Sequence, residues 1–303
     1  MEIDHKLHCN SVCIVIPTHN RKILLQSLLL QIGLQKQLLD DLQITTVVVV
    51  DGSTDGTLEM LAQDFPDAHV VQGDGNWWYT KSMNEGFKYA LKNLKTDFML
   101  TMNDDTEVEP DFLSKMLDGF QKVPKLSIIG AMSITHENPK RVVTSGSYLS
   151  NKLFGKVKHY IPMFTKLSML KVTDQLKESH ILPGRGMLIH KDILQDVGLF
   201  DEKLRQYHSD SDFCLRAKRK GYGVYTYWGA KIFVHHKETG KGTSFKKESF
   251  LNFLSNFFSD TSRIYLPGIA RYKWRYSPKL LWPLNMLIFI GVSFRNHFFK
   301  HKI

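Results

Sequence analysis

The sequence predicts an α/β fold with a mostly parallel central sheet. Short apolar segments alternate with amphipathic segments over residues 12–134, which is the pattern of strands that alternate with helices. The segment 44–50 consists of β-branched residues, as in a strand buried on both faces of a parallel sheet. Several apolar segments also end in polar or acidic residues, at the edge where open α/β sheets bind ligands.

Each element of this half has its own signal. The first apolar run ends at Pro17, leucines recur at helical spacing over 21–35, and Pro110 stands at the start of a helix. We expect strands at 12–17, 44–50, 69–72, 97–102 and 126–134, and helices at 21–35, 57–64, 82–94 and 110–123.

The pattern becomes mixed after about residue 140. A β-hairpin is expected at 142–158, an irregular segment at 161–179, a strand at 187–190, a helix from about Asp210, and strands at 223–227 and 231–235. We expect one domain over 1–245, with a parallel half at 11–135 and a mixed half at 136–245. A helical appendage at 246–303 follows it.

The charge and the cysteine content indicate which kinds of partner and which compartment to expect. The 303 residues carry 40 basic and 30 acidic side chains, a net charge of +10, with a pI of about 9.3. Such a surplus favours an anionic partner, namely nucleic acid, a nucleotide or an acidic membrane surface. Three cysteines make no disulfide framework, and Cys9 and Cys13 lack a second pair at zinc spacing. With no signal peptide at the N-terminus, we expect the cytosolic side.

The end of the chain is basic and aromatic. Its apolar run at 280–294 lies between Lys279 and Arg295 and is shorter than the roughly 20 residues of a membrane-spanning helix. Aromatic and basic residues together are typical of a helix on an anionic bilayer surface. The alternative is a packed helical tail or a dimer contact.

The most informative segment is the acidic loop, residues 103–105, which follows the strand at 97–102. Asp104 and Asp105 would repel each other near a protein interior. A divalent cation such as Mg²⁺ prefers carboxylate ligands and shares its coordination with substrate phosphates. The loop therefore predicts a site for a metal and a diphosphate, against the alternative of a solvated acidic turn.

Polar groups also follow the first two strands. Asp51 can accept a hydrogen bond from a nucleobase, Thr18 and the backbone near Asn20 can reach a ribose, and Arg21 can face a diphosphate. Turn formation and helix capping are the alternative for the segment 51–57.

These motifs together resemble inverting family-2 glycosyltransferases with a GT-A fold, in the rhamnosyltransferase-like branch. The resemblance covers about residues 11–240. It rests on the segments PTHNR (17–21), DGSTDGT (51–57), GNWWYTKSMNEG (75–86), NDD (103–105), GLFDE (198–202) and DSDFCLR (210–216). It implies a Rossmann-like domain in which 11–135 bind the nucleotide-sugar and 136–245 the acceptor.

The resemblance also implies roles for single residues. Asp51 would contact the nucleobase, Asp105 would hold Mg²⁺ or Mn²⁺ and the diphosphate, and Asp104 would contact the ribose or the water shell of the metal. Asp210 would be the catalytic base. A histidine of the pair at 235–236 would complete the metal site; consecutive strand residues face opposite ways, and we favour His235.

Two departures from the family pattern bear on these roles. Asn103 stands where many members have aspartate, although the final carboxylate of the triplet is present. Ser209 stands where many have glutamate, so Asp212 stays an alternative to Asp210 as the base.

The chemistry also follows from the residues. A metal at Asp105 would stabilise the leaving diphosphate as a Lewis acid, and the sugar would pass through an oxocarbenium-like state. One carboxylate, Asp210, then suffices to accept the proton of the acceptor hydroxyl, and a single displacement inverts the anomeric centre. The alternative for Asp210 is an N-cap; Asp212 and Arg216 are expected to pair on the helix.

The complete donor-binding prediction adds residues from three further segments. Trp77 could stack on a sugar or base or pack in the core, Lys81 could neutralise a diphosphate or be exposed, and Arg185 lies between glycines in a loop that suits close approach or a simple turn. The predicted set is Pro17, Thr18, Asn20, Arg21, Asp51, Asn76, Trp77, Lys81, Asp104 and Arg185.

We therefore expect a metal-dependent glycosyltransferase with a UDP- or dTDP-sugar donor. Its acceptor would be a hydroxyl of a cell-surface glycan or a lipid-linked oligosaccharide, at the inner face of the cell membrane; whether it forms a homo-oligomer is left open. One alternative is a nucleotide-sugar-binding or membrane-scaffold protein without turnover. Another is a nucleic-acid binder, which the charge favours but no recognised motif supports.

Overall fold

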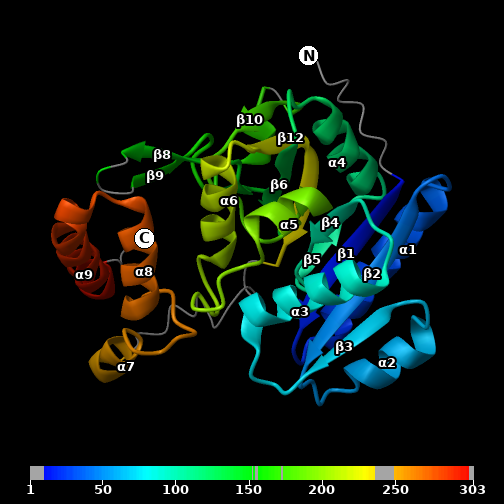
Figure 1. Cartoon of the computed structure of the whole chain (residues 1–303), viewed down its shortest axis with the longest axis horizontal. Coiled ribbons are helices and arrows are strands. Elements are labelled where there is room, and N and C mark those ends of the chain that lie inside the picture. Colours follow the sequence, from blue (N-terminus) through cyan, green and yellow to red (C-terminus); the bar gives the residue numbers. More distant parts are fainter. Residues whose placement is uncertain (1–9, 152, 154–155, 172, 236–248, 300–303) are drawn as a thin grey trace.

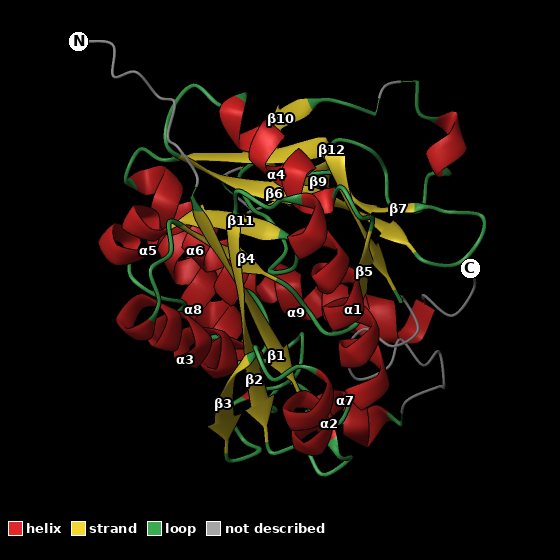
Figure 2. Cartoon of the chain, turned by 90° about the vertical axis from the view of Figure 1, so that its right-hand side faces the viewer, coloured by secondary structure: helices red, strands yellow, loops and turns green. Residues whose placement is uncertain are grey.

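The computed structural model describes residues 10–151, 153, 156–171, 173–235 and 249–299. Within them a ten-stranded mixed sheet forms the centre of the molecule, with helices on both of its faces (Figures 1 and 2). The fold prediction, an α/β domain with mixed additions and C-terminal helices, is confirmed.

The N-terminal half is the predicted parallel sheet. Strands β1 (Ser11–Thr18), β2 (Gln43–Asp51), β3 (His69–Gly73) and β4 (Phe98–Thr101) lie in the order β4-β1-β2-β3, and every pairing among them is parallel. Helices α1 (Lys22–Leu38), α2 (Thr57–Asp64) and α3 (Trp78–Asn93) connect them. The start of α3 was predicted too late, at residue 82, because its first turn contains aromatic residues without a capping signal.

The second half of the sheet is mixed. Strand β11 (Met187–His190) lies antiparallel between β4 and β6 (Ser127–Thr135), and β12 (Gly223–Val234) is parallel to β6. Short strands β5 (Thr106–Val108), β7 (Val142–Thr144) and β10 (Leu176–Glu178) pair antiparallel to their neighbours. The strands expected at 223–227 and 231–235 are one strand, because a register shift between Tyr227 and Lys231 interrupts the pattern without ending the pairing.

Helices α4 (Phe112–Gln121), α5 (Lys191–Val197) and α6 (Ser209–Arg219) complete this half. The predicted hairpin is present as β8 (Ser147–Asn151) paired with β9 (Lys156–His159), and a 3₁₀ turn at Leu167–Met169 lies in the irregular segment.

Two apolar cores cover the two faces of the sheet. Residues of α1, α2 and α4 pack in one, and residues of α3, α5 and α6 in the other. Helix α3 lies very close to the sheet at Gly86, where an added Cβ would lie 2.4 Å from Val15 Cγ1. This contact fixes the height of α3 above β1. Cys13 and Cys214 are buried free thiols, and Cys9 lies outside the described residues.

The C-terminal helices lie beside α6 and the β8–β9 hairpin (Figure 1). They are α7 (Phe250–Ser255), α8 (Leu266–Tyr276) and α9 (Trp282–Phe299), with a 3₁₀ turn at Lys279–Leu281 before α9. Arg271 Nε lies 2.6 Å from Asp201 Oδ2, and Arg275 Nη1 lies 2.7 Å from Asp212 Oδ1. No helix of the described residues is long and apolar enough to cross a membrane. The predicted domain boundary falls on 236–248, outside the described residues.

Candidate functional site

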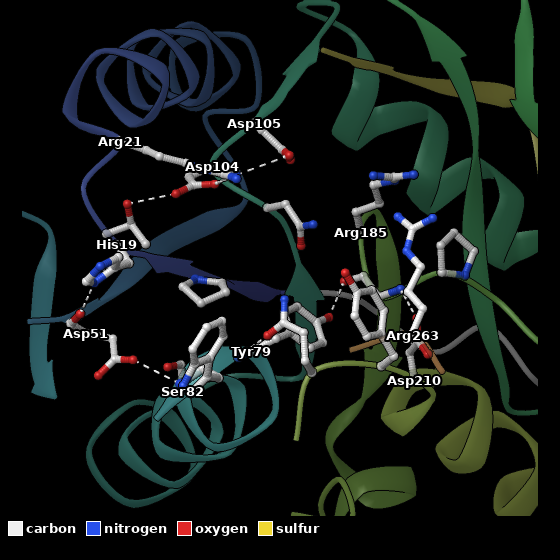
Figure 3. A pocket seen from close by; sticks show the side chains of 18 of the residues that line it. His19, Arg21, Asp51, Tyr79, Ser82, Asp104, Asp105, Arg185, Asp210 and Arg263 are labelled. Atoms are coloured by element: carbon white, nitrogen blue, oxygen red, sulfur yellow. Dashed lines mark hydrogen bonds and ion pairs between the residues drawn. The ribbon is translucent and has the colours of Figure 1, made fainter. Parts of the chain in front are cut away.

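Most of the predicted site residues line one cavity of about 550 Å³. It lies beyond the C-terminal ends of β1, β2 and β4, where the crossovers of an open sheet leave space for a ligand. Its other walls are the loop 183–185, the start of α6 and the segment between α7 and α8 (Figure 3). Of the predicted residues, Pro17, Thr18, Arg21, Asp51, Asp104, Asp105, Arg185 and Asp210 line it.

Asp51 forms one end of the cavity and holds the loop that precedes α3. Its Oδ1 accepts a hydrogen bond from the backbone N–H of Gly75 at 2.8 Å, and its Oδ2 accepts from those of Trp77 and Trp78, both at 2.9 Å. Three of the roughly four acceptor positions of a carboxylate are thereby used. The remaining position can accept from a ligand.

His19 adjoins Asp51 at the same end. Its Nδ1 lies 2.5 Å from the Asp51 carbonyl oxygen, and the residue lines the cavity. The sequence motif contained His19, yet nothing in its spacing distinguished it from its neighbours.

The acidic loop lies in the middle of the cavity and is joined to the first strand. Asp104 accepts hydrogen bonds from Thr18 Oγ1 at 2.8 Å and from Arg21 Nη1 at 3.0 Å, and Arg21 Nη1 also lies 3.2 Å from Asp105 Oδ2. The pKa of Asp104 is raised to about 6, because burial and the neighbouring Asp105 raise it more than Arg21 lowers it. One guanidinium thus contacts two buried carboxyl groups.

Two oxygens of the acidic loop lack partners. Asp105 Oδ1 and Asn103 Oδ1 are buried and make no hydrogen bond to any described residue, although both residues line the cavity. An orphaned buried oxygen is costly. A carboxylate and an amide oxygen are ligands that Mg²⁺ and Mn²⁺ accept, so these residues fit a divalent cation.

Asp210 lies across the cavity from the acidic loop (Figure 3). Its Oδ2 accepts a hydrogen bond from the backbone N–H of Gly184 at 2.8 Å, and its Oδ1 from that of Ser211 at 2.6 Å. These bonds fix the direction of the carboxylate. The competing candidate, Asp212, is fully buried and paired with Arg216 Nε at 2.8 Å, as the helical spacing predicted; it does not line the cavity.

Four of the predicted donor-binding residues lie outside the cavity lining. Asn20 accepts a hydrogen bond from the backbone N–H of Thr54 at 2.7 Å, and Asn76 Oδ1 accepts from Arg205 Nη2 at 2.5 Å. Lys81 Nζ lies 4.8 Å from the centre of the Trp77 ring, and this ring packs partly against the core. These side chains contact the loops around the cavity, and their contact with a donor stays a prediction.

The role of His235 as a metal ligand stays a prediction: the residue lies outside the cavity lining, and with Glu107 and His136 it forms a group whose ligand atoms lie within 4.8 Å of one another and could hold an ion. His235 Nε2 lies 2.7 Å from Glu107 Oε1, and its ring stacks on His136 at a centroid distance of 4.4 Å. Its backbone N–H donates to the carbonyl of Asp105 at 3.4 Å, yet its side chain does not line the cavity. Glu107 lies on β5, and His235 directly follows β12, so the pairing of these two strands brings the two side chains together. His236 lies outside the described residues.

Several lining residues were missed by the sequence reasoning. Trp78 lines the cavity where Trp77 was expected, because the chain turns there with a positive φ of 58° at Trp78. Tyr79 donates a hydrogen bond from its hydroxyl to the carbonyl of Gly184 at 2.9 Å. Arg263 enters from the C-terminal segment. The missed set is His19, Gly75, Trp78, Tyr79, Ser82, Asn103, Pro183, Gly184, Gln206, Tyr207 and Arg263.

Comparison with known proteins identifies the family. The family model described as Glycosyl transferase family 2 matches residues 13–198, more than half of the chain. The low-salt glycan biosynthesis hexosyltransferase Agl10 of Haloferax volcanii is 24% identical over 181 residues, which are 60% of this chain and 56% of that protein. The dTDP-rhamnosyl transferase RfbF of Shigella flexneri is 22% identical over 190 residues, 59% of this chain and 56% of that protein. The chain thus matches little more than half the length of these relatives.

Solved structures agree on the fold. The mannosyltransferase PcManGT of Pyrobaculum calidifontis, in complex with GDP-Man and Mn²⁺, has a TM-score of 0.57 at 15% identity, with coverage of 97% of this chain and 72% of that one. GalNAc-T7 with UDP, GalNAc and Mn²⁺ has a TM-score of 0.57 at 10% identity, with coverage of 94% and 58%. The chain has the GT-A fold and belongs to glycosyl transferase family 2, with rhamnosyl- and hexosyltransferases among its curated relatives.

Proposed function

We propose that this glycosyltransferase moves a sugar from a UDP- or dTDP-sugar to a hydroxyl group, with inversion in a single displacement. The observation that carries the proposal is the position of Asp105 and Asp210 on opposite sides of one cavity, with Asp51 at a third corner. A donor that extends from Asp51 to Asp105 has its sugar between the two carboxylates. The dTDP donor is supported by the similarity to a dTDP-rhamnosyl transferase.

The donor end is built for a nucleoside diphosphate. The free acceptor position of Asp51 suits a base N–H, and Thr18 and Arg21 lie between Asp51 and the acidic loop. Asp105 and Asn103 would hold Mg²⁺ or Mn²⁺ through their unpartnered oxygens. Such an ion, when bound, stabilises the charge that develops on the leaving diphosphate. Arg21 contributes a fixed positive charge at the same place.

Asp210 is the proposed general base. Its two backbone hydrogen bonds hold the carboxylate toward the cavity. Oδ1 also accepts from the Ser211 hydroxyl at 3.3 Å, whereas Oδ2 retains a lone pair that can accept a proton. The acceptor hydroxyl would approach between Asp210 and the donor sugar. It attacks the anomeric carbon on the face opposite the leaving diphosphate while Asp210 takes its proton, which inverts the configuration.

The C-terminal helices support a proposed position at a membrane surface. These helices and the turns between them expose many large apolar side chains, more than isolated surface residues would explain. These are Phe250, Leu251, Phe258, Trp274, Leu280, Leu284, Leu287, Ile288, Val292, Phe298 and Phe299. A helix of this kind inserts its apolar face into the head-group region. A lipid-linked acceptor fits this position, and an N-acetylglucosaminyl-diphospho-decaprenol L-rhamnosyltransferase of Mycobacterium tuberculosis is 20% identical over 213 residues.

Titration with nucleotides tests the proposal. Thermal unfolding is followed with UDP, dTDP and their sugars, with Mn²⁺ and with EDTA, because a ligand of the native state raises its stability. We expect stabilisation that requires Mn²⁺ and is lost in Asp105→Asn. Asp210→Asn should retain it but lose about 10²- to 10⁴-fold in donor turnover. Stabilisation by no nucleotide would refute the proposal, and nucleotide binding with unchanged turnover in Asp210→Asn would refute the assigned base.

A further inference from the structure

Two arginines lie side by side at the acceptor end of the cavity. Arg185 is in the loop before β11, and Arg263 comes from the segment between α7 and α8. Figure 3 shows their guanidinium groups close together on the side of the cavity where Asp210 lies. They come from segments far apart in the chain, so only the folded structure pairs them.

Neither guanidinium has an anionic partner within the described part of the chain. Arg185 Nε is buried without a hydrogen bond, and Arg263 makes one aromatic contact, 5.2 Å from its guanidinium carbon to the centre of the Tyr207 ring. The other arginines near this region each hold a carboxylate: Arg205, Arg216, Arg271 and Arg275. Arg185 and Arg263 therefore stand apart as two cations available to a ligand.

Charges of both signs act on Arg185. Burial lowers its pKa, Asp105 and Asp210 raise it, and the positive charge of Arg263 lowers it. Asp210 directs its oxygens to backbone N–H groups of the loop and of α6, so it does not neutralise the pair by direct contact. An anionic group bound between the two guanidinium groups would contact both of them directly and lower their mutual repulsion.

We infer that Arg185 and Arg263 together bind a phosphate group of the sugar acceptor. This inference rests on the proposed function and adds the acceptor class. Two guanidinium forks match a tetrahedral dianion better than a single carboxylate. The donor's diphosphate is assigned to the acidic loop and Arg21, across the cavity. Arg185, which the sequence assigned to the donor, thereby moves to the acceptor side.

The C-terminal segment becomes part of the site through this pair. Arg263 follows α7 and precedes α8, and α8 is held to the domain by the contacts of Arg271 and Arg275 with Asp201 and Asp212. Helices with an exposed apolar face are thus joined to an anion-binding side chain. This arrangement suits an acceptor whose phosphate lies between a sugar and an apolar chain.

The test is a titration with geranyl phosphate in the presence of saturating UDP and Mn²⁺, which fill the donor end. Geraniol, inorganic phosphate and glucuronate are the comparison ligands, and calorimetry gives the dissociation constants. Arg263→Gln and Arg185→Gln are compared with Arg141→Gln, whose side chain donates to the Phe164 carbonyl outside the cavity. Arg263 is exposed, so its variant should fold normally.

We expect geranyl phosphate to bind, and we expect geraniol and glucuronate to bind much more weakly. Each of the two site variants should weaken it roughly ten- to a hundredfold, with Arg141→Gln and the affinity for UDP unchanged. Weaker UDP binding in Arg263→Gln with unchanged geranyl phosphate binding would overturn the inference, as would tighter binding of glucuronate than of phosphate. Failure of UDP to bind the wild-type protein, measured separately, would instead overturn the proposed function.

Discussion

The Asp51 carboxylate gives the sharpest prediction from the geometry, because it holds a whole loop by backbone contacts. It is 5% exposed and accepts three N–H hydrogen bonds from the segment 75–78. Hydrogen bonds to a charged group contribute about 1.5–3 kcal/mol each, and water can enter beside the exposed Gly75 to offset part of the loss. We expect Asp51→Ala to lower the free energy of unfolding by about 3–4 kcal/mol.

Asp51→Asn removes the negative charge of the side chain and keeps its shape. Its amide oxygen can keep the two bonds to Trp77 and Trp78, while its NH₂ group then faces the N–H of Gly75, a donor against a donor. A loss of about 2 kcal/mol is expected. The control is Asp74→Asn in the same loop, where an exposed carboxylate accepts one bond from the Asn76 N–H at 2.9 Å; its effect should stay below about 1 kcal/mol.

Urea unfolding at neutral pH, followed by tryptophan fluorescence, measures these differences. Nucleotide affinity is measured on the same variants by calorimetry. If the free energy of unfolding of Asp51→Ala lies within about 1 kcal/mol of the wild-type value, the carboxylate does not organise the loop and the reasoning is wrong. Loss of nucleotide binding in Asp51→Asn, at a temperature where this variant is fully folded, would support its contact with the base.

Three further predictions concern packing, the C-terminal contacts and the membrane. Gly86→Ala should destabilise the protein by about 1–3 kcal/mol in urea unfolding, because the added Cβ would lie 2.4 Å from a β1 side chain; an unchanged midpoint would contradict the close contact. Arg275→Gln should lower the free energy of unfolding by about 2 kcal/mol, since it removes one partner of the fully buried Asp212. An unchanged free energy of unfolding would show that the remaining partners of Asp212 suffice. Leu287→Ser, at a side chain 67% exposed, should weaken binding to anionic vesicles several-fold in a sedimentation assay. The matched control, Leu34→Ser on α1 at 49% exposure, should leave it unchanged, and equal effects of both would argue against insertion of α9.

The sequence alone determined the parallel half of the sheet and the acidic end of the cavity. The spacing of apolar residues and the content of β-branched residues can be read within a short segment of the chain. The strands β1, β2 and β4 could therefore be located without coordinates. Because parallel strands end at the same edge, residues that follow them must meet there. Asp51, Asp104 and Asp105 lie together for this reason.

Only the tertiary structure decided which other side chains reach the cavity. The choice of Trp78 over Trp77 depends on a single backbone angle, and the partner of His235 depends on how β5 pairs with β12. Arg263 faces Arg185 because the ion pairs of Arg271 and Arg275 hold α8 against the domain. Such contacts join segments that are distant in the chain, and local periodicity carries no information about their relative positions.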